Sequence, residues 1–298
     1  MSAALRPEQA EDLESLTSDQ RDHLRRVAQM DLFFLSKAIL GYDQVCEQAH
    51  AALCRFMISD PSERRMVLMP RGWLKTTVCT ISDSIRLALC NPDATRILIV
   101  NEIEDNAIGF LKELKGHWMG AGMLPILFPE LVPERTAGPG SDWSMTAASI
   151  QRNSVFKEST WTAMGVGGSA MSQHYSEMKC DDLVGRRAKG SPAEMLTTTN
   201  WTKDAPFLLD TLERRLDLYG TRKAIGDTYS VLMERWPSMA VFMMEPLSDG
   251  ETTFPKISTK SLLKIMVETP EEWAHDYMNN PIGKGGTDWG SDFLSYFV

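Results

Sequence analysis

The sequence predicts an α/β protein in which helices cover a central, mainly parallel sheet. Apolar runs at residues 66–69 and 96–100 have the length of buried strands, and each is followed by a segment whose apolar residues recur at helical spacing. This order of strand, helix, strand and helix over residues 66–118 is typical of a doubly wound sheet. Right-handed crossovers would place the two strands side by side in its centre.

The composition is that of a globular protein that can bury a large core, with 298 residues of which 43% are hydrophobic and 24% are charged. No apolar run approaches the roughly 18 residues that a membrane span requires, and the N-terminus is acidic, so we expect neither a signal peptide nor a membrane partner. The five cysteines form no C-x-x-C pair, which favours reduced thiols in a cytosolic compartment. The net charge of −9 argues against nucleic-acid binding by the whole surface but permits a local basic patch.

The remaining elements follow from periodicity and turn residues. Residues 1–20 predict a frayed lead-in and residues 21–60 predict helices, whereas the proline- and glycine-rich residues 121–143 predict a loop. Ser191, followed by proline and glutamate, has the chemistry of a helix start. Further strands are expected within residues 145–168, 174–185, 214–223 and 240–244. Glu177 and Lys179 interrupt the apolar pattern of the second of these.

The segment "MVLMPRGWLKTT" has the strand–loop–helix context of a phosphate-binding loop. In such a loop the lysine ammonium meets the β- and γ-phosphates and the following hydroxyl binds Mg²⁺, which are the positions of Lys75 and Thr76. Met69 and Leu74 occupy the places where the usual pattern has glycine, and only Gly72 remains. From these residues alone, a Lys-Thr pair that opens an ordinary helix is an open alternative.

Two more groups of polar residues follow expected strands. Asp181 and Asp182 could hold Mg²⁺ and polarise an attacking water, although a solvated acidic turn is an alternative. Gly220, Thr221 and Arg222 could sense the γ-phosphate, although they could equally form a plain turn. All three groups would lie at the carboxyl ends of parallel strands, where open α/β sheets bind ligands.

In combination these motifs resemble the ATPase domain of a tailed-bacteriophage large terminase, the motor that packages viral DNA into a procapsid. That family has Pro-Arg-Gly before Lys-Ser/Thr in a deviant phosphate loop. Residues 157–184 are similar to its approach to the acidic pair, residues 219–232 to its coupling motif, and residues 271–281 to the exit from the domain. The resemblance covers about residues 40–285.

The resemblance implies a P-loop NTPase fold of the additional-strand type. It implies a helical lead-in over residues 1–60 with a possible adenine-pocket segment, and an ATPase domain over residues 61–285 with a small lid at about 200–260. Residues 286–298 would be a linker toward a nuclease domain, which this chain lacks, so we expect no nuclease activity.

The resemblance also assigns roles to residues, with ATP and Mg²⁺ as the ligands. Lys75 would bind the phosphates, Thr76 and Asp181 the metal, and Asp182 would be the catalytic carboxylate. Arg71 would act as a cis arginine or a sensor. The nucleotide-binding set would comprise Pro70, Arg71, Gly72, Trp73, Leu74, Lys75, Thr76 and Thr77, with Gln44 and His50 as candidates for the adenine pocket.

Several of these assignments leave alternatives open. His50 has apolar neighbours at helical spacing and could instead be a packed core histidine.

Thr221, flanked by Gly220 and Arg222, would couple hydrolysis to motion. Arg152, Arg186 and Arg187 are candidates for an arginine that acts on a neighbouring subunit, and the last two could equally lie on a solvated face or in a DNA-contacting loop.

Two departures from the family pattern stand out. Leu74 replaces the glycine that usually precedes the lysine, which leaves the path of the loop open. Asp182 is shorter than the more frequent glutamate.

The expected function is that of an ATP-hydrolysing motor that moves double-stranded DNA through a homo-oligomeric ring. The family also implies a portal protein and a small terminase subunit as partners, in the cytoplasm of an infected bacterium and docked on the procapsid. A helicase-type motor and a non-catalytic nucleotide-binding assembly module are the alternatives.

Overall fold

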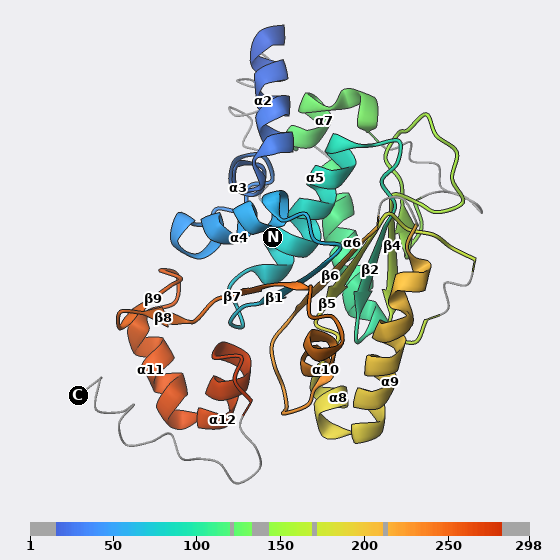
Figure 1. The fold of residues 1–298 in the computed structure, drawn as a ribbon. Helices are drawn as coiled ribbons and strands as arrows, with labels where there is room; N and C mark the ends of the chain where they lie inside the picture. Colours follow the sequence, from blue (N-terminus) through green and yellow to red (C-terminus); the bar gives the residue numbers. More distant parts are fainter. Residues whose placement is uncertain (1–15, 120–121, 133–142, 169–171, 211–213, 282–298) are drawn as a thin grey trace.

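The computed structural model describes residues 16–119, 122–132, 143–168, 172–210 and 214–281. Its centre is a seven-stranded sheet in the order β3-β4-β2-β5-β6-β1-β7 (Figure 1). The strands are β1 Arg64–Leu68, β2 Ile97–Asn101, β3 Ala147–Ala148, β4 Trp161–Gly165, β5 Glu177–Asp181, β6 Arg215–Gly220 and β7 Ala240–Met243. All pair in parallel except the short edge strand β3, which is antiparallel to β4. The predicted α/β fold class is confirmed.

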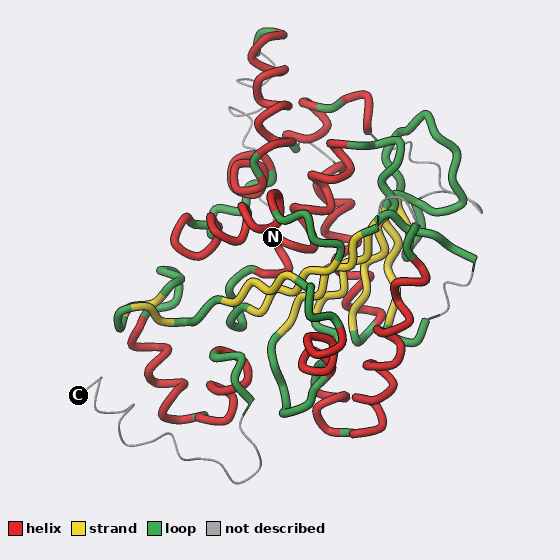
Figure 2. The backbone as a smooth tube through the Cα atoms, viewed as in Figure 1, coloured by secondary structure: helices red, strands yellow, loops and turns green. Residues whose placement is uncertain are grey.

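Helices cover both faces of this sheet (Figure 2). The α-helices are α2 Ser18–Met30, α3 Leu32–Phe34, α4 Glu47–Ser59, α5 Asp83–Cys90, α6 Glu104–Trp118, α7 Met123–Leu127, α8 Arg186–Gly190, α9 Pro192–Asp204, α10 Thr228–Arg235, α11 Thr259–Glu268 and α12 Pro270–Glu272. Wider π-helical turns are η1 Leu35–Ile39, η2 Thr76–Ser82 and η5 Trp273–Tyr277, and 3₁₀ turns are η3 Pro129–Leu131 and η4 Ala205–Leu208. A two-stranded ribbon, β8 Leu247–Ser248 and β9 Glu251–Thr252, precedes α11.

Successive side chains of each strand point to opposite faces of the sheet, so the buried apolar residues form two clusters, one on each face. Val67 faces a core shared with α2 to α7 and α11, whereas Met66 and Leu68 face a core shared with α8 to α10. The N-terminal helices therefore pack into the same core as the sheet.

The strand order differs from one prediction. We expected β1 and β2 to be adjacent, but β5 and β6 lie between them. β6 lies between β1 and β5, so one strand separates the strand before the Lys75 loop from the strand that carries the acidic pair. Leu68 is in register with Gly220, and Asp181 with Tyr219, so these three strands end together.

Two other expectations were wrong in part. Within the predicted loop 121–143, residues 123–131 form α7 and η3, because Leu124, Leu127 and Leu131 bury their side chains in the core. Residues 200–260, where we expected a lid, supply β6 and β7 to the main sheet. The part of the described chain that follows β7 lies outside the main sheet and contains β8, β9, α11, α12 and η5. The predicted linker 286–298 lies outside the described residues.

A buried network of charges explains why β5 carries Lys179. Its ammonium donates to Asp83 at 2.7 Å, to Asp217 at 3.3 Å and to the Tyr219 hydroxyl at 3.2 Å. Arg65 binds Asp217 with two hydrogen bonds, of 2.8 and 2.7 Å. All of these side chains are fully buried, so the network links α5 to β1, β5 and β6 inside the protein.

The five cysteines, which all lie within the described ranges, form no disulfide. None of the helices in the described part of the chain is long and apolar enough to cross a membrane.

Candidate functional site

The loop between β1 and η2 turns through two left-handed residues. Gly72 has a φ of 87° and Leu74 a φ of 52°, a region that side chains with a Cβ rarely adopt. Leu74 therefore takes the turn that glycine makes in the usual loop. Its carbonyl accepts the hydrogen bond from Val78 N at 3.0 Å that starts the helix. The amides of Lys75, Thr76 and Thr77 at this helix start have no preceding helical carbonyl as partner, which favours an anion there.

Trp73 anchors this loop to the core and does not face the pocket. Its side chain is fully buried, and its indole donates to Thr253 Oγ1 at 3.0 Å. The ring packs against Phe254 and Tyr277, with centroid distances of 5.7 and 6.1 Å.

His50 supports the same loop from α4. Its Nε2 lies 3.1 Å from the Trp73 carbonyl, to which it donates, and its Nδ1 lies 3.1 Å from the Cys46 amide nitrogen. Burial lowers the pKa of His50, so the imidazole stays neutral. Among the described residues that line the pocket, neither His50 nor the exposed Gln44 is present. In this structure His50 is packed in the core, as in the alternative, and does not line the pocket.

Lys75 points at the acidic pair. Its Nζ lies 2.9 Å from Asp182 Oδ1 and 3.6 Å from Asp181 Oδ1, and its side chain is only 8% exposed. Burial alone would lower the pKa of Lys75, but the two carboxylates raise it above its ordinary value. The lysine is thus held charged at the start of the helix.

One carboxylate oxygen of Asp181 faces Lys75 but accepts no hydrogen bond among the described residues, which bears on the metal. Oδ2 accepts from Thr80 at 2.7 Å, whereas the buried Oδ1 has no hydrogen-bond partner among the described residues. Burial raises the pKa of this carboxyl, with Lys75 opposing the rise. The hydroxyl of Thr76 also interacts with Asp181. One carboxylate and one hydroxyl with room for phosphate oxygens fit a Mg²⁺ site of this class.

Asp182 leaves the strand in a left-handed conformation with φ of 48°. Its side chain is 52% exposed, so it can reach solvent water from beside Lys75. Asn101, at the end of β2, donates to the Asp181 carbonyl at 2.7 Å and fixes this strand end. Sequence reasoning missed Asn101, although a polar residue directly after an apolar strand is a usable signal.

The three predicted coupling residues do not all face the pocket. Thr221 is 6% exposed and lines it. Gly220 leaves no space for a side chain, since an added Cβ would lie 2.1 Å from the Tyr229 hydroxyl. Arg222 turns away, and its guanidinium binds Asp227 at 3.0 Å and Ser230. It is thereby occupied in fixing the start of α10.

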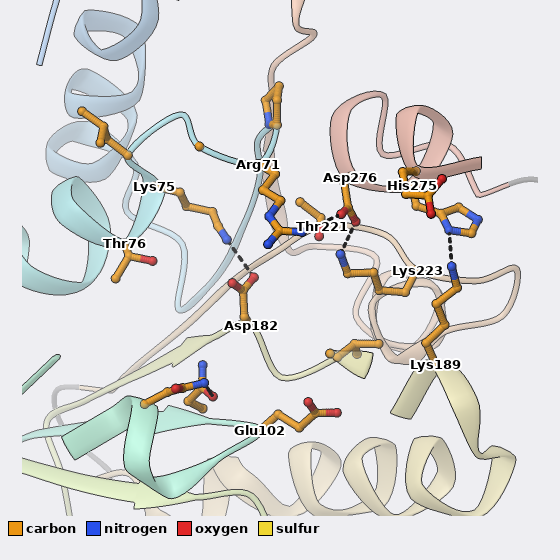
Figure 3. Close-up of a pocket in the computed structure, with 18 of the residues that line it drawn as sticks. Arg71, Lys75, Thr76, Glu102, Asp182, Lys189, Thr221, Lys223, His275 and Asp276 are labelled. Carbon is orange, nitrogen blue, oxygen red and sulfur yellow. Dashed lines mark hydrogen bonds and ion pairs between the residues drawn. The ribbon is translucent and has the colours of Figure 1, made fainter. Parts of the chain in front are cut away.

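A pocket of about 640 Å³ joins these parts (Figure 3). The loop from Pro70 to Thr76 lines it, except for Trp73, together with Asp182 and Thr221. Sequence reasoning missed other charged and polar side chains of the lining, which come from α8, α12, η5 and the segments that follow β2 and β6. These residues are Glu102, Lys189, Lys223, Glu272, His275 and Asp276.

Charged side chains of this part of the lining are held by two sets of contacts. Lys223 forms an ion pair with Asp276, and Lys189 donates to His275 Nδ1 at 3.0 Å. Asp276 also forms an ion pair with the exposed Arg71, whose Nη1 lies 3.3 Å from Asp276 Oδ2. Arg71 thus points across the pocket mouth toward η5.

The candidate trans-acting arginines lie in two places. Arg152 precedes β4 at the amino edge of the sheet, opposite the pocket, where its guanidinium packs on Phe156 and donates to the Glu158 carbonyl at 2.7 Å. Arg187 is exposed on α8, the helix that also carries the pocket residue Lys189. Arg186 begins the same helix.

Comparisons with known proteins give a limited result. No family model and no curated protein matches the chain. Among solved structures, it is similar to a mutant form of the large terminase ATPase domain of Thermus phage P74-26. That match has a TM-score of 0.46 and 12% sequence identity, and covers 83% of this chain and 97% of that one. This similarity is too low to carry over the role of any residue.

Proposed function

We propose that this chain is a Mg²⁺-dependent ATPase of the P-loop type. The observation that carries the proposal is the ion pair between Lys75, which begins the helix after β1, and Asp182, at the end of β5. One strand separates β1 from β5, and all three strands end at the same edge. A lysine, an acidic pair and free helix amides at one strand edge are the parts that phosphoryl transfer requires.

The proposed roles of the site residues follow from how exposed their side chains are. The buried Lys75 would exchange its contact with Asp182 for the β- and γ-phosphates. Asp182, released and half exposed, would orient the attacking water and accept its proton. Thr76 and Asp181 would hold Mg²⁺, which supplies charge neutralisation between phosphate oxygens when bound. Thr221, at the end of the intervening strand, would respond to loss of the γ-phosphate.

We further propose that this ATPase is the motor domain of a viral large terminase. The order and content of the motifs, from Pro70-Arg71-Gly72 to residues 271–281, support this proposal. Identical subunits would form a ring around double-stranded DNA, with a portal protein and a small terminase subunit as partners on the procapsid in the host cytoplasm. An arginine from the neighbouring subunit would complete the site, with Arg187 a candidate because it is exposed on α8, the helix that also carries the pocket residue Lys189.

The test compares the wild-type chain with Lys75→Ala and Asp182→Asn, using Lys264→Ala as the control. Lys264 lies 69% exposed on α11, in a surface pair with Glu268. Asparagine tolerates the left-handed backbone of residue 182, so this variant removes the charge and keeps the turn. We expect each site variant to lose at least about a hundredfold in ATP turnover, with the control unchanged.

Other outcomes separate the alternatives. Undiminished turnover in Asp182→Asn would remove the catalytic assignment of this carboxylate. Tight ATP binding without hydrolysis, even in the assembled state, would favour the assembly module. A dilute monomer that hydrolyses ATP as fast as an assembled ring would contradict the trans-acting arginine. Faster turnover with single-stranded than with double-stranded DNA would favour a helicase-type motor.

A further inference from the structure

One carboxylate in the pocket wall holds two cations that come from neighbouring strand ends. Asp276 Oδ2 lies 3.3 Å from Arg71 Nη1, and Asp276 Oδ1 forms the ion pair with Lys223 Nζ. The main chain reinforces this contact, because Arg71 N donates to the Asp276 carbonyl at 2.7 Å. All three residues line the same pocket as Lys75 and Asp182 (Figure 3).

The topology explains why the two cations meet. Arg71 follows β1 and Lys223 follows β6, and these strands are paired neighbours with Leu68 opposite Gly220. Thr221 and Lys223 face the pocket, whereas Arg222, between them, is turned to Asp227. Lys223 is therefore the cation that this strand end presents to the pocket.

Arg71, Lys223 and Asp276 form a cluster of two cations and one carboxylate, in which the Arg71 side chain is 68% exposed. Lys223 is 18% exposed and Asp276 is 13% exposed, so their ion pair is largely shielded from solvent. Two cations share a single carboxylate, which leaves one positive charge uncompensated within this group. In the view of Figure 3, Arg71 and Thr221 stand between the Lys75–Asp182 pair and Asp276. An anion bound beside Lys75 would share one pocket with Arg71 and Lys223.

We infer that Lys223 is a further nucleotide-contacting residue, which binds the terminal phosphate of ATP together with Arg71, and that the Asp276 carboxylate substitutes for this phosphate when no nucleotide is bound. Carboxylate and phosphate oxygens accept hydrogen bonds from the same charged donors, so the exchange needs no new donor. The inference rests on the proposed ATPase function. It adds a means by which the site distinguishes a nucleoside triphosphate from a diphosphate, because only the triphosphate extends to these cations.

The test measures, by calorimetry, the affinities of the full chain for ADP and for a non-hydrolysable β,γ-imido analogue of ATP in the presence of Mg²⁺. In Lys223→Met we expect the affinity for the analogue to fall about tenfold or more and that for ADP to change less than about twofold. Lys223→Arg keeps the charge and should restore the preference for the analogue. Lys264→Met, at an exposed position of α11, is the matched control and should leave both affinities unchanged.

A second variant should change the ratio of the affinity for the ATP analogue to that for ADP in the opposite direction. Asp276→Asn removes the competing carboxylate, so we expect the analogue to bind more tightly relative to ADP. A fold defect would lower both affinities alike. In a variant that keeps the wild-type affinity for ADP, an unchanged ratio of the two affinities would overturn the inference while leaving nucleotide binding intact. Failure of the wild-type chain to bind either nucleotide would instead refute the proposed function, and the inference with it.

Discussion

Leu74 and Asp182 are the two residues of the described pocket lining, other than glycine, whose backbone lies in the left-handed region. Their φ angles are 52° and 48°; Leu74 directly precedes Lys75, and Asp182 is the ion-pair partner of Lys75. Aspartate visits this region more readily than longer side chains do, because its short polar group can bond locally. The backbone at residue 182 thus offers a physical reason for an aspartate where the resembling family more often has glutamate.

The strain at Leu74 predicts an unusual order of stability for two small substitutions. Both Leu74→Gly and Leu74→Ala remove the packing of the leucine, but only alanine retains a Cβ in the left-handed turn. We expect the glycine variant to be more stable than the alanine variant by about 1 kcal/mol. Chemical denaturation gives the two free energies of unfolding.

The matched control for this pair is Leu196, which is 60% exposed on α9. There alanine should be more stable than glycine, by about 1 kcal/mol, because helix interiors disfavour glycine. The same order at both positions would show that Leu74 carries no backbone strain.

The phosphate loop depends on elements that contribute nothing to the pocket lining. α4 supplies His50, whose Nε2 donates to the Trp73 carbonyl at 3.1 Å, and the segment after β9 supplies Thr253, which accepts from the Trp73 indole at 3.0 Å. Trp73 is thereby held from both sides between the two left-handed turns at Gly72 and Leu74. The loop path is a property of this packing as much as of its own residues.

Replacement of His50 tests whether this support is structural. His50→Leu leaves the buried Trp73 carbonyl without its donor, so we expect a loss of about 1–3 kcal/mol in the free energy of unfolding, measured without nucleotide. Gln44→Ala, at the exposed second adenine candidate, should leave stability unchanged. A His50→Leu protein of full stability but weakened ATP binding would favour the adenine-pocket assignment.

The same variant has a defined pH dependence. Burial lowers the pKa of His50, so the folded state holds fewer protons than the unfolded chain, in which the pKa is about 6.5. The stability that comes from His50 is therefore fully present above that pH and is lost as the pH falls through the lowered folded pKa. The stability difference between wild type and His50→Leu should shrink as the pH falls below about 6.5.

At the scale of the molecule, the buried charge network is a polar connection between α5 and the sheet. Asp83 begins α5 directly after η2, and Lys179 joins it to Asp217 on β6 and, through Arg65, to β1. Because these strands end in the functional residues, the network sets the position of the helix start relative to the acidic pair.

Removal of the central lysine should therefore be costly. Lys179→Met leaves Asp83 and Asp217 each with only one cation inside the core, and we expect a loss of about 3–5 kcal/mol in the free energy of unfolding. Lys264→Met, which breaks only an exposed pair, should change stability by less than about 0.5 kcal/mol. A Lys179→Met loss as small as that of the surface control would show that the network contributes no net stability.

Much of the site could be predicted because local chemistry marks it. The apolar runs before Lys75, Asp181 and Thr221 indicated strands, and polar residues directly after them indicated one functional edge. The sequence could not show that Lys223 faces the pocket whereas Arg222 faces away. Both residues follow β6, and only the conformation of the turn decides where each side chain points. Asp276 could not be placed at all, because nothing near it in the sequence shows that η5 folds back over the loop.

The sequence by itself determined the fold class, the approximate positions of the strands and helices, and which residues could carry phosphate chemistry. These features depend on periodicity and on neighbours along the chain, which the sequence displays directly. The tertiary structure alone decided that β5 and β6 separate β1 from β2, that His50 supports the loop from the core, and that Lys223 and Arg71 converge on Asp276. Each of these depends on contacts between segments far apart in sequence, and local sequence patterns do not predict the free energy of such contacts.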